Sequence, residues 1–168
     1  MEKFGKFLIT IGVCALVFLI VSNIVASYQY SKNVLSYWKL ADKSSTIVEK
    51  SRNLDLFVAQ FSDEKYKGKY DAVIFKTPDN SFDDNFKALT SMQLRLQEIK
   101  TMDVSSFEYQ TAIQQITAQE QGEAFNMLDT LNGVWYKVNY FYLWDWIGFT
   151  FIILSVAILS VGLMIRFW

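Results

Sequence analysis

The sequence predicts an all-α membrane protein, in which two transmembrane helices continue into an antiparallel bundle of three helices outside the membrane. Residues 7–26 and 147–165 are predominantly apolar and contain no Asp, Glu, Lys or Arg. Each has close to the roughly 20 residues that cross a bilayer as a helix. The segment between them holds almost all of the charged residues, and helical apolar periodicity runs through most of it.

Basic residues in the short flanking segments set the predicted orientation. Lys3 and Lys6 precede the first apolar segment, and Arg166 follows the second. Such residues favour the cytoplasmic side of a membrane, so both termini are expected there. The apolar segment 7–26 is longer than the apolar region of a typical signal peptide, so the first helix is expected to be an uncleaved signal anchor. The predicted parts are a cytoplasmic tail (1–6), a first transmembrane helix (7–26), an extracytoplasmic helical domain (27–146), a second transmembrane helix (147–165) and a cytoplasmic tail (166–168).

Aromatic residues mark the outer boundary of both predicted transmembrane helices. Tyr and Trp favour the headgroup layer, where an apolar ring and a polar tip are both satisfied. Asn23 is expected close to this boundary, and the stripe of Tyr136, Tyr140 and Trp144 favours interface anchoring over ligand stacking. The predicted anchors are Tyr28, Tyr30 and Trp38 after the first helix, and Tyr140, Tyr142, Trp144 and Trp146 before the second.

Small residues recur on one face of each predicted transmembrane helix. Such residues let helix backbones approach closely in lipid, where dispersion and weak polar contacts drive association. We expect the two helices to pack on each other, and a site for a helix of another protein is the alternative. The candidate packing residues are Gly5, Gly12, Ser22 and Ala26 in the first helix, and Gly148, Ser155 and Gly162 in the second.

The first helix is expected to continue far beyond the membrane. Leu40, Ile47, Leu54 and Phe61 follow one another at a spacing of seven, which is typical of a helix seam, and no glycine or proline occurs between residues 13 and 67. The spacing therefore predicts one helix to about Ser62, which would extend roughly 50 Å from the membrane at 1.5 Å per residue.

A cluster of lysines follows at the predicted distal tip. Lys65, Lys67 and Lys69 surround Gly68, where a solvated turn is favoured and a contact for a binding partner is the alternative. Residues 72–75 are β-prone, so a short β-hairpin is predicted at this tip.

Two further helices complete the predicted bundle. Pro78 forbids helix through its turn, and Asn80 or Ser81 can then cap a helix that runs to about Lys100. Ser105 and Glu108 have the spacing of a capping box, so a third helix is expected to begin there and to run unbroken into the second transmembrane helix.

Composition excludes several kinds of chemistry. The chain has no histidine, and its single cysteine, Cys14, lies inside the first apolar segment. The composition therefore excludes catalysis by imidazole, an intramolecular disulfide and a Cys-based zinc site. The formal net charge is −1, so no polybasic face indicates binding to nucleic acid. We expect no cofactor and no nucleic-acid partner.

Acidic residues form two patterns that could carry chemistry. Residues 79–85 resemble the first half of a calcium loop, but Asp84 stands where the glycine belongs and Thr90 where the final glutamate belongs, so a helix cap is favoured. Glu120 and Glu123 are spaced to share a helix face, where a solvated surface is favoured over a partner contact. Neither pattern predicts a catalytic or metal-binding residue, and we expect that the protein is not an enzyme.

These features predict a non-catalytic membrane subunit, or an accessory scaffold of a larger membrane complex. Its expected partners are membrane lipids and either other membrane protein subunits or further copies of itself. The alternative is an extracytoplasmic ligand-sensing bundle that signals through a partner protein. In architecture alone, the layout of span, bundle and span is similar to the ligand-binding modules of bacterial chemoreceptors. Glu120 and the spacing of Asn132 and Asn139 also resemble the last helix of LemA-type proteins, but the arginine pair and Pro-Asn element of their first helix have no counterpart here.

Overall fold

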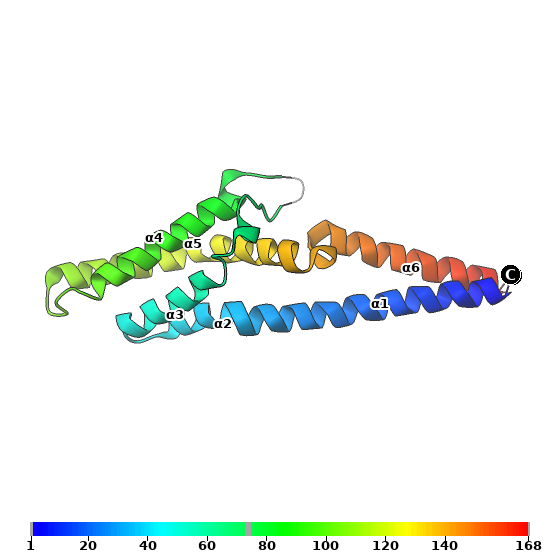
Figure 1. The fold of residues 1–168 in the computed structure, drawn as a ribbon, viewed down its shortest axis with the longest axis horizontal. Coiled ribbons are helices and arrows are strands. Elements are labelled where there is room, and N and C mark those ends of the chain that lie inside the picture. Colours follow the sequence, from blue (N-terminus) through cyan, green and yellow to red (C-terminus); the bar gives the residue numbers. More distant parts are fainter. Residues whose placement is uncertain (1, 73–74, 168) are drawn as a thin grey trace.

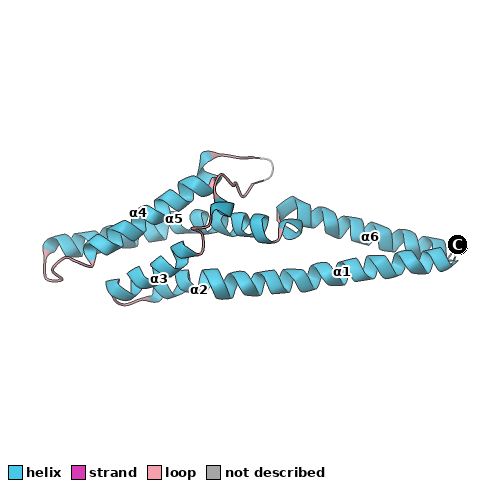
Figure 2. Cartoon of the chain, in the orientation of Figure 1, coloured by secondary structure: helices cyan, strands magenta, loops and turns pink. Residues whose placement is uncertain are grey.

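Helices form 83% of the chain, and the described residues contain no β-sheet (Figure 2). A computed structural model describes residues 2–72 and 75–167, with the side chains of residues 117–125 outside the description. The molecule is elongated, with α1 (Glu2–Tyr30) and α6 (Asp145–Phe167) side by side at one end (Figure 1). The remaining helices, called the polar domain below, lie toward the other end (Figure 1).

The first long helix ends much earlier than predicted. It runs through α1, a π-helical turn η1 (Ser31–Leu35) and α2 (Ser36–Lys43), and then stops. The next helix, α3 (Ile47–Ala59), folds back against α2. The prediction of one helix to about Ser62 is therefore wrong.

Three consecutive hydroxyl residues explain this break. Ser44 leaves the helical conformation with ψ of 128°, and its hydroxyl donates to the Leu40 carbonyl at 2.6 Å. Thr46 then caps α3, because its side chain accepts a hydrogen bond from the Glu49 amide at 3.3 Å. Short hydroxyl side chains compete with the helical hydrogen-bond pattern in this way. The spacing of seven survives the turn but belongs to two helices, with Leu40 52% exposed and Leu54 2% exposed.

An irregular connection links α3 to the next long helix. It contains the short turns η2 (Glu64–Tyr66) and η3 (Pro78–Asn80), and α4 (Phe82–Ile99) follows. The predicted β-hairpin is reduced to one isolated bridge between Tyr70 and Ser81 among the described residues, and Val73 and Ile74 lie outside them. Ser81 precedes α4 as predicted, although its side chain makes no capping hydrogen bond.

The third helix of the polar domain begins one residue later than its predicted capping box. Ser106 caps α5 (Phe107–Asn139), and its hydroxyl accepts from the Tyr109 amide at 3.1 Å. Helices α4 and α5 form a hairpin that projects away from α1 and α6 (Figure 1).

Helix α5 does not continue into α6, which corrects the prediction of one unbroken helix. Tyr140 takes φ of −141° and ψ of 54°, the short turn η4 (Phe141–Leu143) follows, and Asp145 has a positive φ of 46°. A Cβ on Gly148 would lie 2.8 Å from the Leu143 carbonyl oxygen, so the tight return of the chain needs glycine at this position. Gly148, predicted as a contact between the two spans, thus has backbone atoms of Leu143 as its nearest neighbours.

Aromatic side chains join the elements of the polar domain into one core. Phe57 of α3 and Phe61, two residues after its end, are 0% and 1% exposed, and the ring of Phe61 packs edge-on against Tyr66 of η2 at 5.4 Å. The Tyr66 ring stacks on Phe82 of α4 at 5.7 Å. Burying such large rings is the main stabilising contribution to the domain, and it holds η2 against the helices.

Candidate functional site

Helices α1 and α6 approach each other most closely at glycine positions. A Cβ on Gly5 would lie 3.0 Å from the Gly162 carbonyl oxygen, and one on Gly12 would lie 3.0 Å from Leu159. A Cβ on Gly162 would come within 2.8 Å of the Ile9 amide nitrogen. The other small residues predicted to pack, Ser22, Ala26 and Ser155, are buried in these two helices.

Large apolar side chains cover the outside of this helix pair. Only 11% of the residues in the most apolar stretch of the helix Glu2–Lys43 are buried, and 17% in that of Asp145–Phe167. Phe18 is 58% exposed, Ile20 60% and Ile153 53%. Both helices are long and apolar enough to cross a membrane.

The predicted aromatic anchors divide into three groups. Tyr28 and Trp146 are 63% and 58% exposed, as an anchor in the headgroup layer requires. Tyr30, Trp38 and Trp144 are instead at most 9% exposed, which corrects their prediction as anchors. They fill the protein interior. The ring centres of Tyr30 and Trp135 are 5.3 Å apart, and those of Trp38 and Phe57 are 5.4 Å apart. The remaining two contact α1, since Tyr140 donates a hydrogen bond to Gln29 at 2.8 Å and Tyr142 stacks on Phe18.

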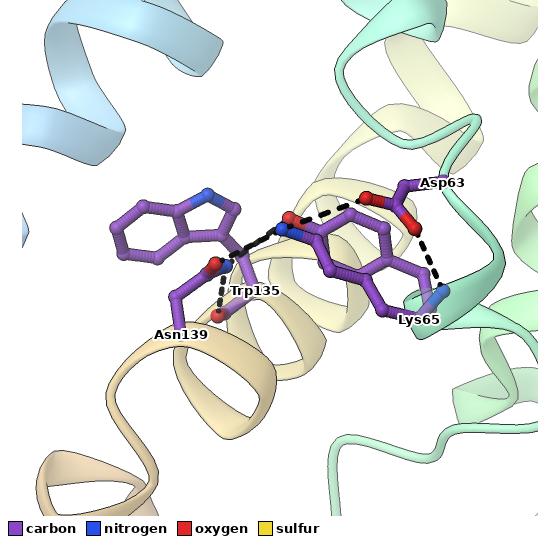
Figure 3. A network of polar contacts seen from close by, with 5 residues as sticks. Asp63, Lys65, Trp135 and Asn139 are labelled. Carbon is purple, nitrogen blue, oxygen red and sulfur yellow. Dashed lines mark hydrogen bonds and ion pairs between the residues drawn. The ribbon is translucent and has the colours of Figure 1, made fainter.

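The predicted tip lysines lie beside the end of α5 and not at the distal end of the molecule. The Lys65 amine donates to the Asn139 side-chain oxygen at 3.3 Å and lies 3.9 Å from Asp63 (Figure 3). The Asn139 amide in turn donates to the Tyr66 hydroxyl and to the Trp135 carbonyl (Figure 3). This correction follows from burial of Tyr66 in the core, because the buried ring holds its neighbours close to α5.

The other two lysines of the cluster, Lys67 and Lys69, are exposed. Lys67 forms an ion pair with Glu64 of the same turn. The segment is held further by Gly68, whose amide donates to the Asp83 carboxylate at 3.0 Å, and Lys69 follows it. The end most distant from α1 and α6 is instead the turn between α4 and α5 (Figure 1).

A pocket of about 420 Å³ lies where α1, the connection after η2, α5 and the start of α6 meet. Sequence reasoning missed this site, because Asp71 lies in an irregular segment and Asp145 begins α6 after the η4 turn, and no periodicity relates either residue to α5. Four of its lining residues were singled out from the sequence, but none as part of a pocket: Asn23, Tyr136 and Trp144 near the membrane boundary, and Asn132 for its spacing to Asn139. The pocket is lined by Asn23, Asp71, Ala72, Asp129, Asn132, Gly133, Tyr136, Leu143, Trp144 and Asp145.

Gly133 allows the two sides of the pocket to meet. A Cβ at this position would stand 2.5 Å from the Cβ of Asp71, which is far closer than van der Waals contact. Within a helix, glycine is less favourable than alanine by about 1 kcal/mol. In the structure Gly133 has a further role: because it has no side chain, Asp71 can pack directly against the surface of α5.

Acceptor oxygens dominate the polar surface of the pocket. Oδ1 of Asp71 and Oδ1 of Asn132 are buried and have no hydrogen-bond partner among the described residues. Burial raises the pKa of the Asp71 carboxyl, and the negative charges of Asp129 and Asp145 raise it further. A ligand with hydrogen-bond donors and a positive charge would satisfy both properties.

Lys137 bounds the same region with a positive charge. Its amine donates to the Tyr70 carbonyl at 2.7 Å and lies 4.3 Å from the centre of the Trp144 ring. Burial lowers the pKa of this amine, and the positive charges of Lys76 and Lys69 lower it further, whereas Asp71 opposes the shift. Lys137 thus ties the connection after η2 to the start of α6.

Metal binding has no support in the described part of the molecule. Among the side chains that the structure describes, no three His, Cys, Asp or Glu residues are grouped so that they could hold a metal ion. The acidic pair Glu120 and Glu123 belongs to α5, and its side chains lie outside the described residues.

No family model, curated protein or solved structure matches the chain. The fold defines its class as a helical protein with two helices long and apolar enough to cross a membrane.

Proposed function

We propose that the protein is a non-catalytic integral membrane protein that serves as a subunit or accessory scaffold of a larger membrane complex. One observation carries the proposal: α1 and α6 pack closely at Gly5, Gly12 and Gly162 and leave their large apolar residues outside. A core helix of a water-soluble protein would instead be mostly buried. Contiguous apolar surface of this extent is stable in lipid and aggregates in water.

The proposed orientation places both termini in the cytoplasm and the polar domain outside. The start of α1 and the end of α6 lie together, since a Cβ on Gly5 would be 3.1 Å from the Arg166 amide nitrogen. A hairpin of this kind brings Lys3, Lys6 and Arg166 to the same side of the membrane. Their positive charges favour the cytoplasmic side.

Two surfaces remain for partner proteins in this arrangement. The outer faces of α1 and α6 can contact lipid or a transmembrane helix of another subunit. The hairpin of α4 and α5 extends past the turn between α2 and α3 (Figure 1) and presents a long helical surface outside the membrane. Such a frame supports binding and positioning of other chains.

A photo-crosslinking experiment in native membranes tests this function. A photoreactive amino acid replaces Ile20 or Ile153, which are 60% and 53% exposed, and Leu19, which is 9% exposed, is the matched control. We expect adducts with another protein chain, or with a second copy, at the two outward positions and none at Leu19. The proposal fails if neither outward position gives a protein adduct and mild detergent releases a lone species of 19.5 kDa.

The pocket favours ligand sensing as a second candidate function. Its volume of about 420 Å³ accommodates a small molecule, and its unpartnered oxygens of Asp71 and Asn132 suit a small organic cation with N–H donors. A thermal-shift screen would compare primary amines with carboxylates of matched size. If the protein senses such a ligand, amines should raise its unfolding temperature, and Asp129→Asn should reduce this stabilisation. A screen in which no compound shifts the unfolding temperature would exclude ligand sensing.

A further inference from the structure

Phe75 is an aromatic residue held outside the core by its own backbone contacts. Its side chain is 81% exposed, although Phe is normally among the buried residue types. The backbone here is fixed, because the Asn80 side-chain amide donates to the Phe75 carbonyl at 2.8 Å and the Thr77 amide donates to the Asn80 side-chain oxygen. The exposed ring therefore belongs to a backbone that is hydrogen-bonded to Asn80 on its C-terminal side.

The segment around Phe75 lies at the level where the apolar helices begin. Ala72 lines the same pocket as Asn23 near the end of the apolar part of α1, and as Asp145 at the start of α6. The Tyr70 carbonyl receives the hydrogen bond of Lys137, whose amine lies over Trp144. The described parts of the connection between η2 and η3, residues 67–72 and 75–77, extend toward the α6 end of the molecule (Figure 1).

Exposed lysines flank the aromatic residue. Lys69 and Lys76 are both exposed, and the Lys76 amine lies 5.8 Å from the centre of the Tyr70 ring. The positive charges of Lys69 and Lys76 both lower the pKa of Lys137. Positive groups from the connection and from α5 therefore lie near one another beside the start of α6. The acidic groups Asp71, Asp129 and Asp145 lie in the neighbouring pocket between the helices.

We propose that Phe75, Lys69 and Lys76 form a third membrane contact, in addition to α1 and α6. The Phe75 ring enters the boundary between headgroups and acyl chains in the leaflet that faces the polar domain, and the two amines bind lipid phosphates. An aromatic ring with flanking lysines suits this layer, because lysines keep their charged ends at the headgroups while apolar atoms lie deeper. The proposal rests on the proposed function, because it requires α1 and α6 to cross the same bilayer.

A second exposed phenylalanine shows that exposure alone does not indicate lipid contact. Phe107 is also 81% exposed, but it begins α5 at the turn farthest from α1 and α6. The two residues are matched in type and exposure and differ in distance from the proposed membrane. They are therefore a natural test pair.

Lipid quenching of a fluorophore compares these positions in the full chain. Cys14 is exposed on α1 and is the only cysteine, so it carries the label in the unaltered protein. In a Cys14→Ser background, Phe75→Cys and Phe107→Cys carry the same label. The three proteins are reconstituted into vesicles whose lipids bear a nitroxide near the headgroup end of the acyl chain for positions 75 and 107, or near its terminal methyl group for Cys14, which lies near the middle of the segment 7–26. Circular dichroism confirms that each labelled protein retains its helices.

The proposal predicts that lipid quenching at position 75 exceeds that at position 107 by about twofold or more, with the reverse order for quenching by aqueous iodide. Equal quenching at 75 and 107, together with strong lipid quenching at Cys14, would overturn the proposal and leave the proposed function intact. Absence of lipid quenching at Cys14 would overturn both. A matched Lys69→Glu, Lys76→Glu variant should lose part of the quenching at position 75 in anionic vesicles, and no change would contradict the role of the amines.

Discussion

Gly133 and Asp71 approach each other so closely that a Cβ on the glycine would stand 2.5 Å from the Cβ of the aspartate. This contact joins an irregular segment to the middle of a long helix, and it forms one side of the pocket beside the start of α6.

Gly133→Ala is expected to destabilise the polar domain, although alanine favours helix by about 1 kcal/mol over glycine. Displacing Asp71 from a packed contact costs about 1–3 kcal/mol, which exceeds the gain in helix propensity. Denaturant unfolding measures the difference. Adding Asp71→Gly removes the opposing Cβ and should restore stability to Gly133→Ala, so an additive double mutant would contradict the contact.

Asp71→Asn is expected to raise stability at neutral pH. The folded state raises the pKa of this carboxyl above its ordinary value of 3.8, chiefly through burial and secondly through Asp129. The folded state therefore binds the proton more tightly, and its stability falls as pH rises from 3.8 through the folded pKa. Because the group is partly exposed, we expect a gain of about 1 kcal/mol or less at neutral pH, which shrinks as pH falls toward the unfolded value.

Asp103 provides a control of opposite sign for this pH dependence. The Ser105 amide and then the Ser105 hydroxyl lower the pKa of its carboxyl by hydrogen bonding. Its contribution is present above the unfolded pKa and is lost as pH falls through the folded pKa. Thermal unfolding of Asp71→Asn and Asp103→Asn across acidic and neutral pH should give slopes of opposite sign relative to the unaltered protein. Parallel slopes would show that Asp71 is not desolvated.

Thr46→Ala is expected to weaken the turn that separates α2 from α3. The substitution removes the hydroxyl that accepts from the Glu49 amide, and loss of such a cap costs about 1 kcal/mol. Ser45→Ala is the matched control, because the neighbouring Ser45 is exposed and is not the capping residue. Equal unfolding midpoints for the two variants would argue for a different helix start.

Gly12→Val is expected to separate α1 from α6. A Cβ there already meets the Leu159 backbone at 3.0 Å, so the larger side chain forces the helices apart at a cost of about 1–3 kcal/mol. Cys14→Val places the same side chain on the exposed face of α1 and should be tolerated. Thermal unfolding in detergent compares them, and equal stability would mean that the glycine contact contributes little.

The sequence predicted the elements that depend on local pattern. The apolar helices follow from residues 7–26 and 147–165, because length and hydropathy alone decide whether such a segment can cross a membrane. The start of α4 and the approximate start of α5 follow from proline and capping residues. The turn at Thr46 was missed because a spacing of seven can pass through two antiparallel helices as well as through one.

The pocket is formed by contacts between residues that are far apart in the sequence, and a local sequence pattern does not predict such contacts. Asp71 reaches α5 because the buried Tyr66 holds its segment there and because Gly133 has no side chain. The same packing places Lys65 beside Asn139, whereas a helix extended to Ser62 would have carried this lysine to the distal end. One missed turn therefore displaced the whole predicted lysine cluster.

The central claim is that α1 and α6 cross one bilayer as a hairpin, with the polar domain outside and the termini inside. Labelling of single cysteines with a membrane-impermeant thiol reagent in intact cells tests it most directly. In a Cys14→Ser background, Val104→Cys, 65% exposed at the distal turn, should react in intact cells, and Lys3→Cys should react only after permeabilisation. Reaction of Lys3→Cys in intact cells, or of Val104→Cys only after permeabilisation, would contradict the account.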